Sequence, residues 1–322
     1  MANPGIAFLF PGQGSQAVGM GKDLADRYPV AKQTFSEADE ALGIKLSQLC
    51  FEGPEERLRL TENTQPAILT VSVAAWRVLN EKGIKPAFAA GHSLGEYSAH
   101  VAAGTLTFAD AVRAVRNRGR YMQEAVPVGT GAMAAIVGMN LEAVSALCAD
   151  AGQGEVCEPA NINSPDQIVI SGHAGAIERA VKLAEERGAK RAKLLPVSAP
   201  FHCSLMKPAQ DRLAKDLEGL NFSAPQVPVV ANVYAKPVED AIGAREALIR
   251  QVTGSVQWSE SIQWLAARGV QTFVEVGPGK VLCGLMRQID RTKKAVNVED
   301  EASLQKALEY LAQSEAPAAV QA

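Results

Sequence analysis

The sequence predicts an α/β protein with a mostly parallel sheet and a small subdomain inserted into it. Three observations lead to this fold class. Short apolar runs alternate with helix-like segments in the first and last parts of the chain, which is typical of a parallel sheet covered by helices. Between them, residues 132–197 follow the order βαββαβ of ferredoxin-like folds. The 322 residues, 47% of them hydrophobic, suffice for one large domain or two.

The first predicted elements bring a glycine-rich loop to the edge of the sheet. The apolar run Ile6–Phe10 is predicted to be a buried strand, and Pro11–Gln16 follows it as a loop whose glycines let backbone amides approach a ligand. Helical periodicity then predicts helices over residues 21–42, 66–82 and 110–124.

A second apolar run, Ala87–Ala90, leads into Gly91–Gly95, with the sequence Gly-His-Ser-Leu-Gly, and then into a helix-like segment, 96–103. A Gly-x-Ser-x-Gly turn between strand and helix is the context of a nucleophile elbow, where the serine oxygen is exposed and the next amide can face an oxyanion. The alternative is a serine that only caps the helix. The context favours acyl chemistry at Ser93.

The middle of the chain is predicted to form the inserted subdomain. We expect strands at residues 132–137, 156–162, 167–170 and 193–197, and helices at 141–151 and 175–187. Gly129, Gly131 and Pro200 mark its boundaries. We therefore expect a discontinuous large domain, residues 1–128 and 198–313, around a subdomain of residues 129–197.

The α/β alternation resumes after the subdomain. We expect strands at residues 227–233 and 272–276, and helices at 239–252, 258–268 and 304–311. Residues 314–322 have nothing to bury and are predicted to be a flexible tail.

Composition and charge exclude several classes of function. A net charge of −3 gives no basic field, so we expect no nucleic-acid partner. The five cysteines lack Cys-x-x-Cys or Cys/His spacing, which argues against a disulfide framework and against a metal site. The sequence has no signal-peptide pattern and no apolar stretch of membrane-spanning length, so we expect a cytoplasmic protein without a membrane partner.

A serine hydroxyl needs a base, and histidine is best matched to that task at neutral pH. Of the four histidines, His92 adjoins Ser93 in a turn that points neighbouring side chains apart, His100 lies inside the next helix, and His173 begins a helix of the subdomain. His202 lies in a loop that leaves the last strand of the subdomain. By elimination, His202 is the preferred base.

The third member of a triad is less clear from the sequence. The acidic residues between Ser93 and His202 that could serve, Asp150, Glu158 and Asp166, fall within the predicted subdomain. A Ser–His dyad with a neutral orienting group is an alternative, because a backbone carbonyl can hold the tautomer of the ring.

Arg118 differs from the other arginines of its helix. Winding residues 110–124 at about 100° per residue places Arg113, Arg116 and Arg120 together on one side and Arg118 on the opposite flank, beside the apolar stripe. A guanidinium there needs an anionic partner. The partner is either an internal carboxylate or a substrate carboxylate held by two parallel hydrogen bonds.

Several spaced motifs together resemble those of one family. They are Phe10-Pro11-Gly12-Gln13-Gly14-Ser15-Gln16, Gly91-His92-Ser93-Leu94-Gly95-Glu96, Arg118-Gly119, Asn161-Ile162-Asn163-Ser164-Pro165, Phe201-His202 and Glu275-Val276-Gly277-Pro278-Gly279. In this order, over about residues 5 to 300, the chain resembles the malonyl-CoA:acyl carrier protein transacylases. The resemblance implies an α/β-hydrolase-like large domain with a ferredoxin-like insertion.

The resemblance also implies roles for individual residues. Ser93 would be the nucleophile, His202 the base and then the acid, and Arg118 the clamp on the malonyl carboxylate. The amides of Gln13 and Leu94 would form the oxyanion hole. Further implied site residues are Gln251, which would orient His202 through its backbone carbonyl, and the pocket residues Gln65, Asn161 and Asn163.

The implied reaction is a ping-pong transfer. Malonyl passes from malonyl-CoA to Ser93 and then to the phosphopantetheine thiol of holo acyl carrier protein, supplying fatty-acid synthesis without a cofactor or metal. Related domains that accept an α-methyl group often carry Gln and Ser where this chain has Leu94 and Phe201, and the bulk of Phe201 favours malonyl over methylmalonyl.

Other functions remain open at this point. A Ser–His thioesterase or esterase would share the elbow but would release free acid and would not need Arg118. A methylmalonyl-type or polyketide acyltransferase would differ in its acyl group or pathway. A non-catalytic module that binds acyl carrier protein would tolerate the loss of Ser93.

Overall fold

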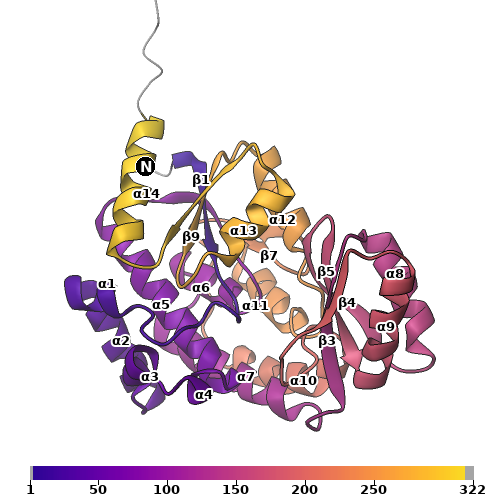
Figure 1. The fold of residues 1–322 in the computed structure, drawn as a ribbon. Coiled ribbons are helices and arrows are strands. Elements are labelled where there is room, and N and C mark those ends of the chain that lie inside the picture. The colour runs from indigo at the N-terminus through magenta and orange to yellow at the C-terminus, as the bar shows by residue number, and fades with distance from the viewer. Residues whose placement is uncertain (1–2, 316–322) are drawn as a thin grey trace, which may run out of the picture.

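The computed structural model describes residues 3–315, and within this range the chain forms two sheets (Figure 1). The larger sheet has the order β10-β9-β1-β2-β7-β8, with parallel pairs everywhere except between β7 and β8. Its strands are β1 (Asn3–Phe10), β2 (Pro86–Gly91), β7 (Val229–Ala231), β8 (Lys236–Val238), β9 (Thr272–Val276) and β10 (Lys294–Val298).

Helices cover both faces of this sheet because its strands are apolar on both faces. Phe8 and Phe10 of β1 belong to one core cluster, and Ala7 and Leu9 belong to a second cluster on the opposite face, as the two-residue period of a strand requires. The helices of the large domain are α1 (Lys22–Arg27), α2 (Pro29–Leu42), α3 (Leu46–Glu52), α4 (Glu55–Leu58), α5 (Thr61–Glu81), α6 (Gly95–Ala102), α7 (Phe108–Glu124), α10 (Lys207–Glu218), α11 (Ala241–Arg250), α12 (Trp258–Ala267), α13 (Val281–Ile289) and α14 (Glu301–Glu315).

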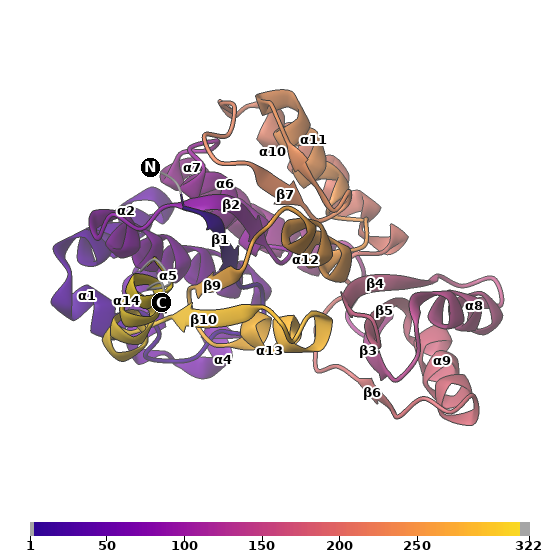
Figure 2. The same ribbon diagram turned by 90° about the horizontal axis from the view of Figure 1, so that it is seen from above.

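The smaller sheet is antiparallel and has the order β4-β5-β3-β6, the strand arrangement of a ferredoxin-like unit. Its elements are β3 (Gly131–Val137), α8 (Leu141–Gly152), β4 (Cys157–Ser164), β5 (Gln167–His173), α9 (Ala174–Glu186) and β6 (Arg191–Leu194). Figure 2 shows α8 and α9 on the side of this sheet that faces away from the large domain. The other side is turned toward the large domain.

The predicted fold class is confirmed, with local differences. The helix expected over 21–42 is two helices, α1 and α2, because the chain turns at Tyr28 and Pro29 begins the second helix, where its missing N–H has no partner to lose. The expected strand 193–197 is β6, two residues earlier, and its last residues instead form a loop. The helix expected to begin at Pro66 starts at Thr61.

One expectation concerns the C-terminal end of the chain. Helix α14 runs to Glu315, so the first two residues of the predicted tail 314–322 are helical, and its remainder lies outside the described residues.

The domain boundaries at 129 and 197 stay a prediction, although the strands of the smaller sheet all lie between them. None of the helices within residues 3–315 is long and apolar enough to cross a membrane.

Candidate active site

The turn between β2 and α6 presents Ser93 in a strained conformation. Ser93 has a φ of 53°, which is uncommon for a residue with a side chain. The flanking glycines allow the turn: a Cβ on Gly91 would lie 1.9 Å from the carbonyl carbon of Gly95, and a Cβ on Gly95 would lie 2.1 Å from the carbonyl oxygen of Phe10. The strand, the turn and the helix therefore pack too closely for any residue except glycine at these two positions.

His202 lies against Ser93. It also has a positive φ, 60°, in the loop before α10, and its Nε2 is 2.7 Å from Ser93 Oγ. Its Nδ1 donates to the carbonyl oxygens of Gln251 at 2.9 Å and Gly254 at 3.2 Å. Because a carbonyl can only accept, Nδ1 carries the proton and Nε2 is free to accept from the serine hydroxyl.

The environment keeps His202 uncharged. Burial, together with the charge of Arg118, lowers the pKa of His202 to about 3. None of the acidic candidates for a third member contacts it: Asp150 pairs with Arg187, Asp166 accepts from Ser164, and Glu158 accepts from Ser204. The orienting partners of His202 are backbone carbonyls.

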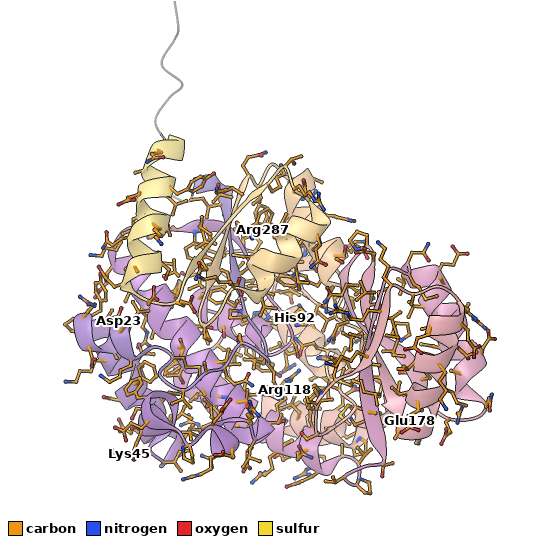
Figure 3. The ribbon with its side chains drawn as sticks, in the orientation of Figure 1. Asp23, Lys45, His92, Arg118, Glu178 and Arg287 are labelled. Carbon is orange, nitrogen blue, oxygen red and sulfur yellow. The ribbon has the colours of Figure 1, made fainter. Side chains whose placement is uncertain are left out.

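Arg118 is 2% exposed, and Figure 3 shows it below His92, the residue that precedes Ser93 in the chain. Its Nη2 donates to Ser93 Oγ at 3.0 Å and to Gln251 Oε1 at 2.9 Å, and its Nη1 donates to Gln65 Oε1 at 2.7 Å. Within residues 3–315 no carboxylate lies at ion-pair distance from it, so the internal carboxylate that the sequence left open is not found. A buried guanidinium held by neutral groups is suited to an anionic ligand.

These groups meet in a cavity of about 130 Å³ between the large domain and the smaller sheet. It is lined by predicted site residues, which are Gln13, Gln65, Ser93, Leu94, Arg118, Asn161, Phe201 and His202. Its other walls were not predicted and come from His92, Met122, Met133, Leu195 and Val197. The apolar side chains among these carry no sequence signal, because a methionine or leucine in a core has the same pattern.

Two predicted site residues do not line the cavity. Asn163 is buried, and its Oδ1 lies 2.8 Å from Nε2 of His92, whose ring centroid is 5.4 Å from that of Trp258. Asn163 therefore holds the wall residue His92 in place. Gln251 is also behind the wall and contacts both His202 and Arg118.

The backbone amides of Gln13 and Leu94 are the predicted oxyanion donors. Leu94 precedes α6, so its N–H is among the amides that a helix N-terminus leaves without a helical acceptor. In the part of the chain that the structure describes, neither amide donates a hydrogen bond to another protein group. Both residues line the cavity, and their amides stay the predicted oxyanion donors.

Asn232 is a site residue that sequence reasoning missed. Its Oδ1 accepts from the amide of Ser93 at 2.7 Å, and its Nδ2 donates to the carbonyl oxygen of Gly91 at 2.7 Å. It thereby fixes the backbone of the elbow from the turn directly after β7, a strand far away in the sequence. Only the pairing of β2 with β7 brings it there, and no local pattern signals that pairing.

Within residues 3–315, no group of three or more His, Cys, Asp or Glu side chains is placed to hold a metal ion.

Known proteins resemble this chain over most of its length. The model of the acyl transferase domain family matches residues 7–309. The chain is 53% identical over 304 residues to a malonyl CoA-acyl carrier protein transacylase of Salmonella typhimurium, covering 94% of this chain and 98% of that protein.

Solved structures of such proteins are also similar. An acyl carrier protein S-malonyltransferase from Vibrio cholerae superimposes with a TM-score of 0.93 and 54% identity, covering 94% of this chain and 99% of that one. A malonyl-transacylase in complex with its type II PKS acyl-carrier protein gives a TM-score of 0.93 and 51% identity, with 95% and 99% covered. The chain therefore belongs to the acyl transferase domain family and, within it, to the malonyl CoA-acyl carrier protein transacylases.

Proposed function

We propose that this protein transfers malonyl from malonyl-CoA to the phosphopantetheine thiol of acyl carrier protein through a malonyl ester on Ser93. One observation carries the proposal: Ser93 Oγ lies 2.7 Å from the base His202 and 3.0 Å from the buried cation Arg118. A serine and a histidine suit any acyl group, but an unpaired guanidinium beside them suits an acyl group that ends in a carboxylate.

In the first half-reaction, Ser93 Oγ attacks the thioester carbonyl carbon while its proton passes to Nε2 of His202. The developing oxyanion accepts hydrogen bonds from the amides of Gln13 and Leu94. The intermediate collapses, the carbon–sulfur bond breaks, and His202 returns the proton to the departing CoA sulfur. Malonyl is then bound to Ser93 as an ester.

The second half-reaction reverses these roles. The thiol of the carrier's phosphopantetheine gives its proton to His202, and the sulfur attacks the ester carbonyl carbon. Ser93 leaves and regains the proton from His202. A thioester is exchanged for a thioester without net oxidation, so the proposed reaction includes no cofactor.

Arg118 would bind the free carboxylate of the malonyl group. Its planar guanidinium can donate two parallel hydrogen bonds to a carboxylate, and burial strengthens that interaction because water does not compete. Gln65 and Gln251, which accept from the two Nη atoms, hold the guanidinium in one orientation.

Phe201 supports malonyl as the acyl group instead of methylmalonyl. Phe201 lines the cavity, as does His202, the next residue in the chain. Met133 and Val197 also line the cavity and limit the space for the acyl group. A methyl branch at the α-carbon would have to displace part of this wall. Equal transfer rates from malonyl-CoA and methylmalonyl-CoA would contradict this assignment.

A product-partition assay tests the proposed function. The protein is mixed with malonyl-CoA and holo acyl carrier protein, and the malonyl carrier and free malonate are both quantified, with Ser93→Ala and a carrier without phosphopantetheine as controls. The proposal predicts malonyl carrier as the main product and no product with either control. Malonate released as fast as CoA would indicate a thioesterase, and transfer by Ser93→Ala would exclude the serine ester.

A further inference from the structure

Glu96 is a buried carboxylate directly behind Ser93. It lies in the first turn of α6, and its side chain is 0% exposed. In the described part of the chain, no Lys or Arg lies at ion-pair distance from it, and His100 Nε2 is 4.0 Å from its Oε1. Burial lowers the pKa of His100 to about 3, so this imidazole is uncharged at neutral pH. A buried carboxylate without a cationic contact costs stability, so its presence here needs a reason.

Hydrogen bonds through two other residues connect Glu96 to the backbone of Ser93. Its Oε2 accepts from the amide of Asn232 at 3.0 Å and from Nε2 of Gln251 at 2.7 Å. The side chain of Asn232 in turn accepts from the amide of Ser93, and Nε2 of Gln251 also donates to the carbonyl oxygen of Ser93 at 2.9 Å. One carboxylate oxygen therefore fixes both residues that hold the peptide groups of Ser93.

Through Gln251, Glu96 is also connected to the base His202 and to the buried cation Arg118. The carbonyl oxygen of Gln251 accepts from His202, and its Oε1 accepts from Nη2 of Arg118. The Gln251 amide thus lies between the positive charge of Arg118 and the negative charge of Glu96. A direct ion pair would occupy the guanidinium, whereas this amide link leaves it able to bind a substrate carboxylate.

We propose that Glu96 is a positioning residue of the acyl transfer site, which holds Asn232 and Gln251 in place and supplies the negative charge that offsets Arg118 when no substrate carboxylate is bound. This assignment rests on the proposed function. It explains why a carboxylate is present at this buried position, although a neutral side chain of the same shape would cost less free energy to bury.

The proposal predicts opposite substrate preferences for the loss of Glu96 and the loss of Arg118. Proton transfer from Ser93 makes His202 an imidazolium in the same pocket as Arg118, and the two positive charges repel each other. In malonyl transfer the substrate carboxylate offsets Arg118. In acetyl transfer the Glu96 charge is the one that remains, so its removal slows acetyl transfer more than malonyl transfer.

The experiment compares kcat and KM for malonyl-CoA and acetyl-CoA in Glu96→Gln and the unaltered protein. Burial raises the pKa of Glu96 to about 7 although Asn232, Gln251 and Arg118 oppose the shift, so the assay is run at about pH 8, where the carboxylate is ionised. Glutamine keeps the shape and one acceptor oxygen but removes the charge. We expect kcat to fall about tenfold more for acetyl than for malonyl.

Two further variants separate charge from structure. Glu275→Gln removes an equally buried carboxylate, which accepts from the amides of Leu282 and Cys283 away from the cavity, and we expect it to leave the malonyl-to-acetyl ratio unchanged. Glu96→Asp keeps the charge but shortens the side chain, and we expect it to lower kcat for both substrates at an unchanged ratio.

The outcomes distinguish this inference from the function on which it rests. If the unaltered protein transfers no malonyl, the proposed function fails, whatever the ratio. An equal loss for both substrates in folded Glu96→Gln, or a larger loss for malonyl, makes Glu96 a structural residue and overturns the inference. If Glu96→Gln does not fold, the pH dependence of the unaltered protein decides: a kcat that falls more for acetyl than for malonyl as the pH drops from about 8 to about 6, where Glu96 becomes protonated, supports the inference, and a constant ratio overturns it.

Discussion

At the scale of single residues, the site combines strain with burial. Ser93 and His202 both have positive φ values, and each such conformation costs about 1–3 kcal/mol that the surrounding packing must offset. The hydrogen bonds of Ser93 to Asn232 and of His202 to Gln251 supply part of that compensation. The proposed nucleophile and base are therefore fixed before a substrate arrives, which avoids the entropy cost of ordering them during the reaction.

Arg118→Ala tests the proposed clamp. Removing one partner of a buried charge pair costs several kcal/mol, so we expect kcat/KM for malonyl-CoA to fall by about 100-fold or more. For acetyl-CoA, which lacks the carboxylate, we expect a loss of less than about tenfold. Arg120→Ala, an exposed arginine of the same helix, is the matched control and should change neither value. Equal losses for the two substrates in Arg118→Ala would remove the clamp from the mechanism.

The charge state of His202 gives a second prediction at this scale. Because burial and Arg118 lower its pKa to about 3, its imidazole should stay neutral as the pH falls from 8 to about 5, where an ordinary histidine becomes charged. NMR titration of the histidine ring resonances measures this directly. In Arg118→Ala the pKa of His202 should rise, because the repulsion from the Arg118 charge is gone. A midpoint near the ordinary value in the unaltered protein would contradict the buried site described here.

Much of the site was predictable at the residue scale because its chemistry limits the choices. Four histidines and one elbow serine left few combinations, and His202 does contact Ser93. A backbone carbonyl was one of the alternatives for the partner of His202, and its assignment to Gln251 was implied only by the resemblance to the family. Asn232 and Glu96 could not be predicted, because an asparagine after a short strand and a glutamate in a first helical turn are ordinary surface patterns.

At the scale of elements, the elbow depends on two glycines that let β1, β2 and α6 approach each other. Gly95→Ala would place a Cβ 2.1 Å from the carbonyl oxygen of Phe10, and we expect it to lower the free energy of unfolding by about 3 kcal/mol or more. Gly152→Ala is the matched control, since its Cβ would meet nothing within 4 Å at the end of α8. We expect that change to be neutral or slightly stabilising.

Chemical denaturation of the two variants provides the measurement. A Gly95→Ala protein as stable as the unaltered chain would show that the elbow can widen, and the argument from close packing would be wrong.

Element boundaries were predicted less well than element types. The apolar pattern identified β1, β2 and α7, whose apolar residues pack into the core clusters. It ran through the break between α1 and α2, because both helices bury their apolar residues in the same core cluster and the pattern does not change at Pro29. Helices α10 and α13 were not predicted, although each buries an apolar face.

At the scale of the whole molecule, the cavity exists because two separately built sheets meet. The large domain supplies Ser93 and Arg118, while Met133, Leu195 and Val197 come from the smaller sheet and the loop that follows it. The order βαββαβ was visible in the sequence since each element is short and locally patterned. How the two sheets face each other was not, because that depends on contacts between residues far apart in the chain.

The boundary of the subdomain near residue 129 is still a prediction, and limited proteolysis tests it. Val128 is 85% exposed in the segment before β3, and elastase cleaves after small aliphatic residues in exposed loops. Within residues 3–315 we expect the first cut after Val128, giving one fragment that ends at Val128 and one that begins at Gly129 by mass spectrometry. A first cut between residues 141 and 186 would instead show that the subdomain unfolds locally before the protease cleaves the segment at Val128.

The central claim is that Ser93 carries malonyl and passes it to a thiol and not to water. Intact-mass spectrometry after brief mixing with malonyl-CoA, followed by addition of holo acyl carrier protein, tests it most directly. The account predicts one malonyl adduct on the protein, none on Ser93→Ala, and quantitative discharge of the adduct onto the carrier. An adduct that forms on Ser93→Ala, or that is lost to water as fast as to the carrier, would contradict it.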